Sequence, residues 1–267
     1  MSTVPPAATG PTASGPSSSG PAASGPSSSG PSSSGPSSSG PAAGRTRTTY
    51  RQVRFERGDG ATEILLVRHG ESAIADPAHP FELLDGRGDP ELSAEGRMQA
   101  EAVCARLASL ELAAIYVTPL RRTAETAAAL AQKLGLEPVV EPGLVEVDMG
   151  EWEGGLYRER IAARDPLAAR VFLEERWDVI PGAESNDSLT GRTSAAIARI
   201  ARAHRGSTVV AVSHAAAIAS VLAAAASSRP FAFVSVDNAS ISSIVVEGEH
   251  QTLRRFNDTA HLEAVRP

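Results

Sequence analysis

The amino-acid sequence predicts a three-layer α/β/α sandwich with a mostly parallel central sheet, preceded by a disordered tail. From residue 62 onward, apolar stretches of strand length alternate with amphipathic stretches of helical period. Such alternation implies crossover connections that place helices on both faces of a parallel sheet, and the last strands read as a meander. Residues 1–44 show neither pattern.

The opening segment is of low complexity. Residues 10–44 repeat a Gly-Pro pentad, and this period of five excludes a collagen helix, which needs glycine at every third residue. Residues 1–44 contain no charged side chain and few apolar ones, so they cannot offset the entropy of an ordered chain. We predict a disordered tail over 1–44, a basic linker over 45–61 and one α/β domain over 62–267.

The linker is basic because five arginines outnumber two acids: Arg45, Arg47, Arg51, Arg54 and Arg57 against Glu56 and Asp59. A solvated linker is the favoured interpretation, and contact with an anionic partner is the alternative.

Overall charge and composition exclude several classes of protein. The 267 residues hold 25 Lys and Arg against 31 Asp and Glu, a net charge of −6, which argues against general nucleic-acid binding. The single cysteine, Cys104, excludes an internal disulfide framework. Neither a signal peptide nor an apolar run of about 20 residues is present. We therefore expect a soluble, cytoplasmic protein that binds no membrane, and the oligomeric state stays open.

Each element follows from local pattern. Apolar or β-branched runs predict strands over 64–67, 114–117, 138–140, 209–212, 233–236, 241–246 and 252–256. Ser93 caps a predicted helix whose apolar residues recur at helical spacing. Thr118-Pro119 starts a second helix that ends at Gly135, a third spans about 188–204, and an Ala-rich helix follows His214.

Chemically active residues stand at three strand ends. The first strand ends in Arg68-His69-Gly70, the second runs into a helix that carries Arg122, and the fourth ends at His214. Ligands of such sheets bind beyond the carboxyl ends of the strands, so we expect these side chains to converge.

This set suits a phosphoryl group. Arginine pairs with phosphate oxygens at any pH, and the helix starts after Thr118 and His214, with the Ala215 amide, add positive potential. A neutral imidazole can attack phosphorus and form phosphohistidine. Gly70 is expected to allow a sharp turn that keeps His69 accessible. A metal site is disfavoured, because the adjacent cations repel a metal ion and no metal-binding spacing occurs.

A leaving alkoxide also needs a proton. The segment LVEVDMGEWEG (144–154) supplies Glu146 as the first candidate, with Asp148 and Glu153 as fallbacks. A general acid there requires a pKa raised by desolvation or by the charge of the phosphate.

These segments together resemble the histidine phosphatase superfamily, with the phosphoglycerate-mutase-like fold. The resemblance covers about residues 62–262 and rests on RHGES (68–72), GDPELSAEGRMQA (88–100), TPLRRTAETA (118–127), LVEVDMGEWEG (144–154), VVAVSHAAAI (209–218) and RRFNDTAHL (254–262). It implies that 62–267 is a histidine phosphatase domain.

The resemblance also implies roles. His69 would be the nucleophile, Arg68, Arg122 and His214 would hold the phosphate, and Glu146 would donate the proton. Ser72 would contact the substrate, and Arg122 rather than its neighbour Arg121 fits the family spacing. No metal or other cofactor is implied, and the expected ligand is a small phosphorylated substrate. His79, His204, His250 and His261 are assigned no chemistry.

Several positions depart from the family pattern. Ala75 stands where the family usually has asparagine, Ala215 and Ala216 replace glycines, and Thr123 replaces alanine. The insertion 74–87 is expected to line or cover the entrance.

The expected activity is phosphomonoester hydrolysis. A phosphoglycerate mutase is the first alternative, although the Phe-Thr-Gly-Trp and Arg-Arg-Ser-Tyr-Asp segments typical of mutases do not occur. A catalytically weak phosphate-binding protein is the second. Substrate selectivity is expected to reside in residues 74–87 and 155–185.

Overall fold

The computed structural model describes residues 49–265. The predicted tail, 1–44, and the first residues of the predicted linker lie outside this range. Two compact units are separated between Val53 and Arg54, and the helices and strands named below belong to the second. Among residues 49–265 no helix is both long and apolar enough to cross a lipid bilayer.

The central sheet has six strands in the order β5-β4-β6-β1-β7-β8. They span Val139–Val140 (β5), Ala114–Val117 (β4), Thr208–Ser213 (β6), Thr62–Arg68 (β1), Ile241–Glu247 (β7) and His250–Asp258 (β8). The first four are mutually parallel, and β7 pairs antiparallel with both β1 and β8. The predicted, mostly parallel sheet with a terminal meander is confirmed.

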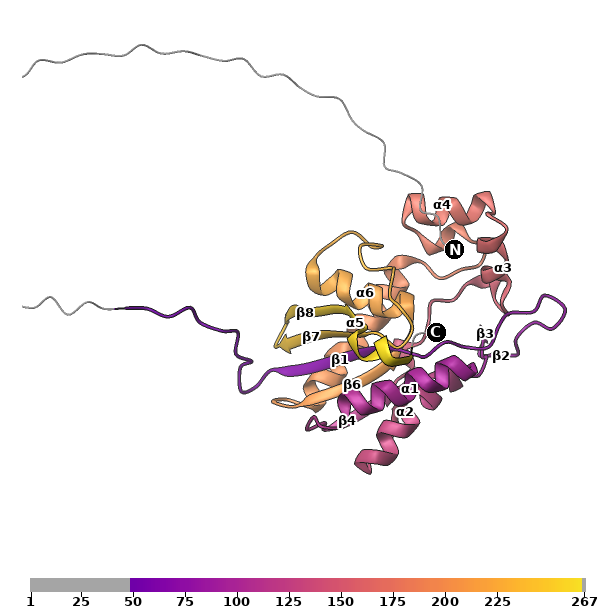
Figure 1. Ribbon diagram of the computed structural model, residues 1–267. Coiled ribbons are helices and arrows are strands. Elements are labelled where there is room, and N and C mark those ends of the chain that lie inside the picture. Colours follow the sequence, from indigo (N-terminus) through magenta and orange to yellow (C-terminus); the bar gives the residue numbers. More distant parts are fainter. Residues whose placement is uncertain (1–48, 266–267) are drawn as a thin grey trace, which may run out of the picture. The chain divides into compact units, whose positions relative to one another are not determined.

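Helices cover both faces of this sheet (Figure 1). Helices α1 (Ala94–Leu107) and α2 (Arg121–Leu134) pack on one face, and α5 (Asn186–Ala203) and α6 (Ala215–Ala226) on the other. Successive side chains of a strand point to opposite faces. Leu65 and Val67 accordingly join the α1/α2 core, whereas Ile64 and Leu66 join the α5/α6 core.

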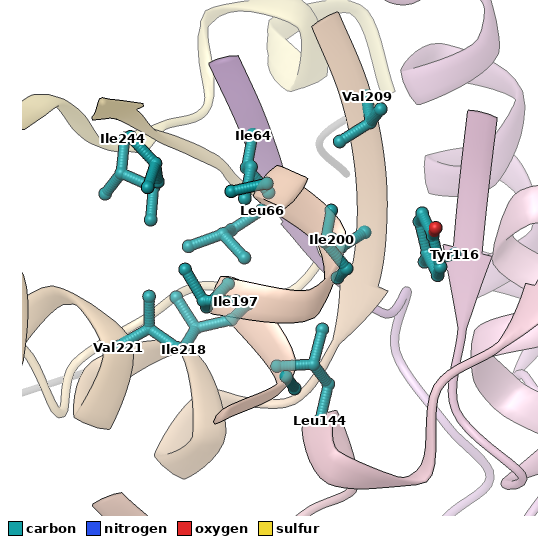
Figure 2. Packing of buried hydrophobic residues seen from close by; sticks show 14 of the residues in the cluster. Ile64, Leu66, Tyr116, Leu144, Ile197, Ile200, Val209, Ile218, Val221 and Ile244 are labelled. Carbon is teal, nitrogen blue, oxygen red and sulfur yellow. The ribbon is translucent and has the colours of Figure 1, made fainter. Parts of the chain in front are cut away.

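Figure 2 shows the α5/α6 core, with Ile197, Ile200, Ile218 and Val221 packed against sheet residues such as Ile64. Both faces of β1 are therefore buried, which explains why its sequence is continuously apolar rather than alternating.

The predicted helix ends are present. The Ser93 side chain accepts a hydrogen bond from the Gly96 amide at the start of α1. Gly135 ends α2 with a left-handed φ of 66°. The third predicted helix begins slightly earlier than expected, because the Ser185 side chain accepts from the amide of Ser188.

One predicted strand is wrong. Residues 233–236 form turns, in which the Val234 amide donates to Phe231 and the Val236 amide donates to Val234. This run is apolar because Val236 belongs to the α5/α6 core and Phe233 packs against it, without any strand pairing.

Four short elements are not predicted by the sequence patterns. They are the β2–β3 hairpin (Leu83–Leu84 and Arg87–Gly88), α3 (Leu156–Ala162) and α4 (Pro166–Glu174). Short 3₁₀ helices occupy Pro142–Leu144, Gly150–Trp152, Trp177–Val179 and Ala260–Val265. In Figure 1 the hairpin, α3 and α4 lie beyond the carboxyl end of β1.

The end of the predicted linker makes specific contacts with the domain. Nη1 of Arg57 donates to the Ser207 carbonyl at 3.0 Å and to Oγ1 of Thr208 at 2.8 Å, and Nη2 donates to the Gly206 carbonyl at 2.9 Å. The Arg254 guanidinium, on β8, lies 3.6 Å from the centre of the Phe55 ring. Arg57 is thus held beside the amino end of β6, while residues 51–56 are exposed.

Two glycines set the distance between β1 and α1. A Cβ atom on Gly70 would lie 2.5 Å from the Gly96 carbonyl oxygen, and one on Gly96 would lie 1.9 Å from the Glu71 carbonyl oxygen. Neither glycine has a positive φ. Gly70 is therefore required by close backbone contact and not by the sharp turn expected from the sequence.

Gly96→Ala tests this contact. We expect a loss of about 3 kcal/mol in the free energy of unfolding, because backbone atoms must move to admit the methyl group. Gly191→Ala in α5 is the matched control, since nothing lies within 4 Å of its added Cβ, and alanine should stabilise that helix by up to about 1 kcal/mol. Denaturant titration measures both changes. Unchanged stability of Gly96→Ala would contradict the contact.

Candidate active site

Strands β1 and β6 end side by side and bring two histidines together. Arg68 is paired with Ser213, and the His69 amide donates to the Ser213 carbonyl at 2.9 Å. The residue that follows each strand is a histidine, His69 after β1 and His214 after β6, and both lie at the same edge of the sheet. The ring centroids of His69 and His214 are 5.2 Å apart, in an edge-to-face arrangement.

His69 is held in one tautomer. Its Nδ1 lies 2.6 Å from the Gly70 carbonyl oxygen, which can only accept, so Nδ1 carries the proton. Nε2 keeps its lone pair, which accepts a hydrogen bond from Nε of Arg122 at 3.3 Å. Burial, followed by the charges of Arg122 and Arg68, holds the pKa of His69 well below its ordinary value of 6.5. The imidazole is thus neutral, and its unprotonated nitrogen is Nε2, which faces Arg122.

Arg122 is buried without a carboxylate partner. Its Nη1 donates to the Gly88 carbonyl at 2.9 Å, and burial lowers its pKa to about 10. Within residues 49–265 neither Arg122 nor Arg68 forms a salt bridge. Both guanidinium groups therefore keep charge available for an anion.

Arg68 is half-buried and oriented by a carbonyl. Its Nη1 donates to the carbonyl of Val236. Its Nε is fully buried and has no hydrogen-bond partner within the described part of the chain. Burial also lowers the pKa of Arg68. An unpaired buried donor is costly, so an acceptor supplied by a ligand would relieve this cost.

The turn formed by residues 236–240 clamps the end of β1. Nδ2 of Asn238 donates to the His69 carbonyl at 3.0 Å, and the Ala239 amide donates to the Arg68 carbonyl at 3.0 Å. Asn257 fixes this turn from β8, because its Oδ1 accepts from the Asp237 amide and its Nδ2 donates to the Asp237 carboxylate. Asn257 adopts φ of 53° where β8 bulges opposite Ser242. The C-terminal Asn-Asp motif thus positions both site residues of β1.

His214 is fully buried and borders His69. Its Nε2 lies 2.9 Å from Oγ1 of Thr118, while Nδ1 has no partner within the described residues. The Thr123 hydroxyl uses its hydrogen on backbone carbonyls, so the Thr118 hydrogen is free to point at Nε2. That arrangement leaves a proton on Nδ1. Burial is the main cause of the lowered pKa of His214, followed by Arg122.

Glu146 caps α6. Its Oε1 accepts from the amides of Val147 at 3.0 Å, Ala216 at 3.1 Å and Ala217 at 3.2 Å. Within residues 49–265, Oε2 has a single long contact of 3.5 Å with the Ala216 amide. The positive end of α6, which the sequence assigns to phosphate, is therefore largely occupied by this carboxylate. Oε2 is the less engaged of its two oxygens.

Two arginines that sequence reasoning missed hold the Glu146 backbone. Nε of Arg87 and Nη2 of Arg192 donate to the Glu146 carbonyl at 2.9 and 3.0 Å. Arg192 also binds both carboxylate oxygens of Glu184 at 2.8 Å, with part of the pair buried. No local motif marks these residues, because both belong to segments whose contact with 144–154 appears only in the fold.

Asp148 and Glu153, the two alternative proton donors, accept hydrogen bonds from backbone amides of the surrounding loops. Oδ1 of Asp148 accepts from the Gly150 amide at 2.8 Å. Glu153 accepts from the amides of Gly88 at 2.8 Å and Met149 at 2.9 Å, and burial raises its pKa. Glu153 thus ties the β2–β3 hairpin to the acid segment.

Arg121 and Ser72 form hydrogen bonds with Asp89 and Arg158 rather than with His69. The Arg121 amide and Nε bind Asp89, each at 2.8 Å, which supports Arg122 as the inward-facing residue of the pair. Oγ of the buried Ser72 accepts from Nη2 of Arg158 at 2.7 Å. Arg158, on α3, is a further cation near the site, and the sequence patterns gave no reason to single it out.

The remaining histidines lie apart from His69. His79 pairs with Asp76 at 2.7 Å, and Nε2 of His204 lies 2.8 Å from the Tyr116 hydroxyl. Nε2 of His261 lies 3.0 Å from the Ala239 carbonyl. Within residues 49–265 no three His, Cys, Asp or Glu side chains gather closely enough to hold a metal ion.

A cavity of about 460 Å³ opens over part of this constellation, and we call it the catalytic cavity. Arg68, His69, Arg122 and Glu146 line one part, whereas the fully buried His214 lies behind them and is not a lining residue. Its other walls are mainly apolar or aromatic: Phe81, Met149, Trp152, Tyr157, Phe172, Trp177, Val234 and Val236. Trp152 and Trp177 also pack in a separate hydrophobic core.

Several known proteins are similar to this chain in sequence. A phosphoserine phosphatase from Hydrogenobacter thermophilus is 32% identical over 203 residues, which cover 75% of this chain and 94% of that protein. A bifunctional protein of Mycobacterium tuberculosis is 37% identical over 154 residues, covering 57% of this chain. Those residues are 41% of its length, so the chain spans about two fifths of that relative.

Solved structures share the fold. A mycobacterial glucosyl-3-phosphoglycerate phosphatase superposes with a TM-score of 0.62 at 26% identity, covering 74% of this chain and all of the other. The profile of the histidine phosphatase superfamily (branch 1) matches residues 64–259. The chain belongs to the histidine phosphatase superfamily, branch 1.

Proposed function

We propose that this protein is a phosphomonoesterase that hydrolyses a small phosphorylated substrate through a phosphohistidine at His69, without a metal or other cofactor. The observation that carries the proposal is the neutral His69 imidazole, whose unprotonated Nε2 accepts a hydrogen bond from Arg122 in a cavity that Glu146 also lines. The phosphatases among the relatives support the same reaction class.

In the first step Nε2 of His69 attacks phosphorus. The N–P bond forms while the bond from phosphorus to the ester oxygen breaks. Arg68, Arg122 and Nδ1–H of His214 donate to the equatorial oxygens and hold the charge that spreads over them. Oε2 of Glu146 gives its proton to the leaving alkoxide, which departs as the alcohol.

In the second step water replaces the alcohol. The Glu146 carboxylate takes a proton from this water as its oxygen attacks phosphorus, and the N–P bond breaks. Inorganic phosphate leaves, His69 regains its lone pair and Glu146 is again protonated. The three amides on Oε1 keep the carboxyl group in place for both transfers.

Hydrolysis is favoured over the mutase reaction because the two segments typical of mutases are missing. A catalytically weak binding protein is disfavoured because the proposed nucleophile and proton donor share one cavity. Composition further supports a cytoplasmic location and a role without nucleic-acid or membrane binding. Ser72 is proposed to act on substrate through Arg158, and residues 1–44 are proposed to be dispensable for turnover.

The nucleophile is tested by trapping the intermediate. With a ³²P-labelled phosphomonoester and a chelator, rapid mixing followed by an alkaline detergent quench should leave one acid-labile phosphate per chain. His69→Ala should abolish labelling and turnover, whereas Arg121→Ala, whose side chain faces Asp89, should retain both.

Labelled His69→Ala, or wild type that neither turns over nor becomes labelled, would contradict the mechanism. Chelator-sensitive turnover would contradict its metal independence. Exchange of 2- and 3-phosphoglycerate faster than hydrolysis would establish the mutase instead.

The proton donor is tested by leaving-group dependence. Glu146→Gln should slow phosphoenzyme formation from an alkyl phosphate by about 10²- to 10⁴-fold, because alkoxide departure needs a proton. p-Nitrophenyl phosphate needs little protonation and should show a burst of one nitrophenolate per chain, followed by slow release of phosphate. Glu151→Gln, an exposed residue of the same segment, should behave as wild type. Equal losses for both esters would contradict the role of Glu146.

The neutral imidazoles are tested by titration. NMR spectra should show His69 and His214 uncharged as the pH falls through 6.5, because burial and Arg122 disfavour protonation. The unfolded chain binds those protons first, so the free energy of unfolding should fall as the pH falls below 6.5. His69→Asn and His214→Asn assign the signals. Titration of either ring at or above 6.5 would contradict the assignment.

A further inference from the structure

A second cavity adjoins the catalytic cavity and has no role in the mechanism above. Its volume is about 680 Å³, and we call it the loop cavity because the loop 74–80 and helix α3 form most of its wall. Arg68, Glu153, Gly155 and Arg158 line both cavities. The two cavities therefore adjoin one another at these four residues.

Small residues meet at this junction. A Cβ atom on Gly155 would lie 3.1 Å from Cβ of Ala75 and 3.3 Å from the Phe81 ring. Gly155 also has φ of 105°, which side chains rarely adopt. Ala75 stands where the family pattern has a larger, polar asparagine. A larger side chain at Gly155 would therefore crowd Ala75 and Phe81 where the two cavities adjoin.

The loop cavity presents apolar groups to solvent. Its apolar lining residues are Ile74, Ala75, Pro77, Pro80, Leu156 and Ala162. Ile74 is 85% exposed. Apolar side chains gathered around a cavity next to a reactive centre are typical of a ligand-binding wall.

The charges of this cavity disfavour an anion. Its two cations, Arg68 and Arg158, are both at the junction, and Arg158 is engaged with the Ala73 carbonyl at 2.8 Å and with Ser72. The other charged lining residues are acids: Glu71, Asp76, Glu153 and Glu159. A carboxylate beyond the junction would meet like charge without a free cation to bind it.

We propose that the loop cavity binds the alcohol part of the substrate, and that this substrate is the phosphomonoester of a long, mainly apolar alcohol without a second anionic group. This inference rests on the proposed function. The phosphoryl group lies at His69, the adjoining carbons contact the apolar wall near Glu146, and the distal carbons pass Gly155 into the loop cavity.

Three esters test the substrate class: n-butyl phosphate, n-octyl phosphate and 7-carboxyheptyl phosphate. Because a fully buried methylene contributes about fourfold to binding, kcat/KM for the octyl ester should exceed that for the butyl ester by about tenfold or more. The carboxylate ester should be no better than the butyl ester. Equal values for butyl and octyl esters, or the highest value for the carboxylate ester, would overturn the proposal.

The site is tested by filling its distal end. Ala162→Trp should remove the advantage of the octyl ester through a higher KM and leave the butyl ester unchanged. Ala163→Trp is the matched control, because Ala163 follows on the same exposed helix end and does not line the cavity. Ala162→Leu should give a smaller loss in the same direction. Equal effects of Ala162→Trp and Ala163→Trp would overturn the proposal.

Charge gives an independent readout. Glu159→Gln should raise kcat/KM for the carboxylate ester severalfold at low salt and leave the octyl ester unchanged, whereas Glu101→Gln on α1 should change neither. No gain for the carboxylate ester would overturn the electrostatic part of the proposal.

p-Nitrophenyl phosphate distinguishes failure of the loop-cavity proposal from failure of the phosphatase proposal. If the protein turns over p-nitrophenyl phosphate and Ala162→Trp leaves kcat/KM for octyl phosphate unchanged, only the loop-cavity proposal is overturned. If no ester is turned over, the phosphatase proposal is overturned. Calorimetric binding of octyl phosphate to wild type and to Ala162→Trp then decides the loop cavity separately, because equal affinities would overturn it.

Discussion

Two guanidinium groups that are withdrawn from water and form no salt bridge within residues 49–265 are the constraint on which this site depends. Arg68 and Arg122 are oriented by the carbonyls of Val236 and Gly88 instead. Carbonyl dipoles fix a cation in place but do not cancel its charge. The same charge, added to burial, keeps His69 neutral. An anion that enters this site meets strong donors together with a neutral imidazole.

Such a site lowers stability, and the surrounding fold offsets the cost. The 236–240 turn binds the carbonyls of both Arg68 and His69, and Asn257 secures that turn from the last strand. On the other side, the partly buried pair of Arg192 and Glu184 holds the acid segment by its backbone. The reacting groups are thus fixed by elements far apart in the sequence.

Much of this was predictable because strand ends are local signals. An apolar run followed by Arg-His places both residues at a sheet edge, and the parallel order of β1 and β6 then brings His214 beside His69. The 236–240 turn was not predictable from the apolar segment that precedes it, since Phe233 and Val236 fit a strand pattern equally well. The contacts of Glu146 with amides at the start of α6 were also missed. A helix start predicts that an anion binds there, but not whether this anion is a phosphate or a carboxylate of the protein. Arg158 was missed because its helix, α3, is short and shows no hydrophobic periodicity from which it could be predicted.

The contacts of Phe55 and Arg57 have a consequence for how the protein can be attached to a surface. Arg57 fastens the chain beside the amino end of β6, and Phe55 contacts Arg254 on β8, whereas His69 and His214 follow the carboxyl ends of β1 and β6. The peptide that leads into the domain is therefore held at Arg57, at the end of β6 opposite to His214. Immobilising the protein on a bead or an electrode through a group placed beside Arg57 would leave the cavity facing the solution, an orientation that random coupling through surface carboxylates does not provide.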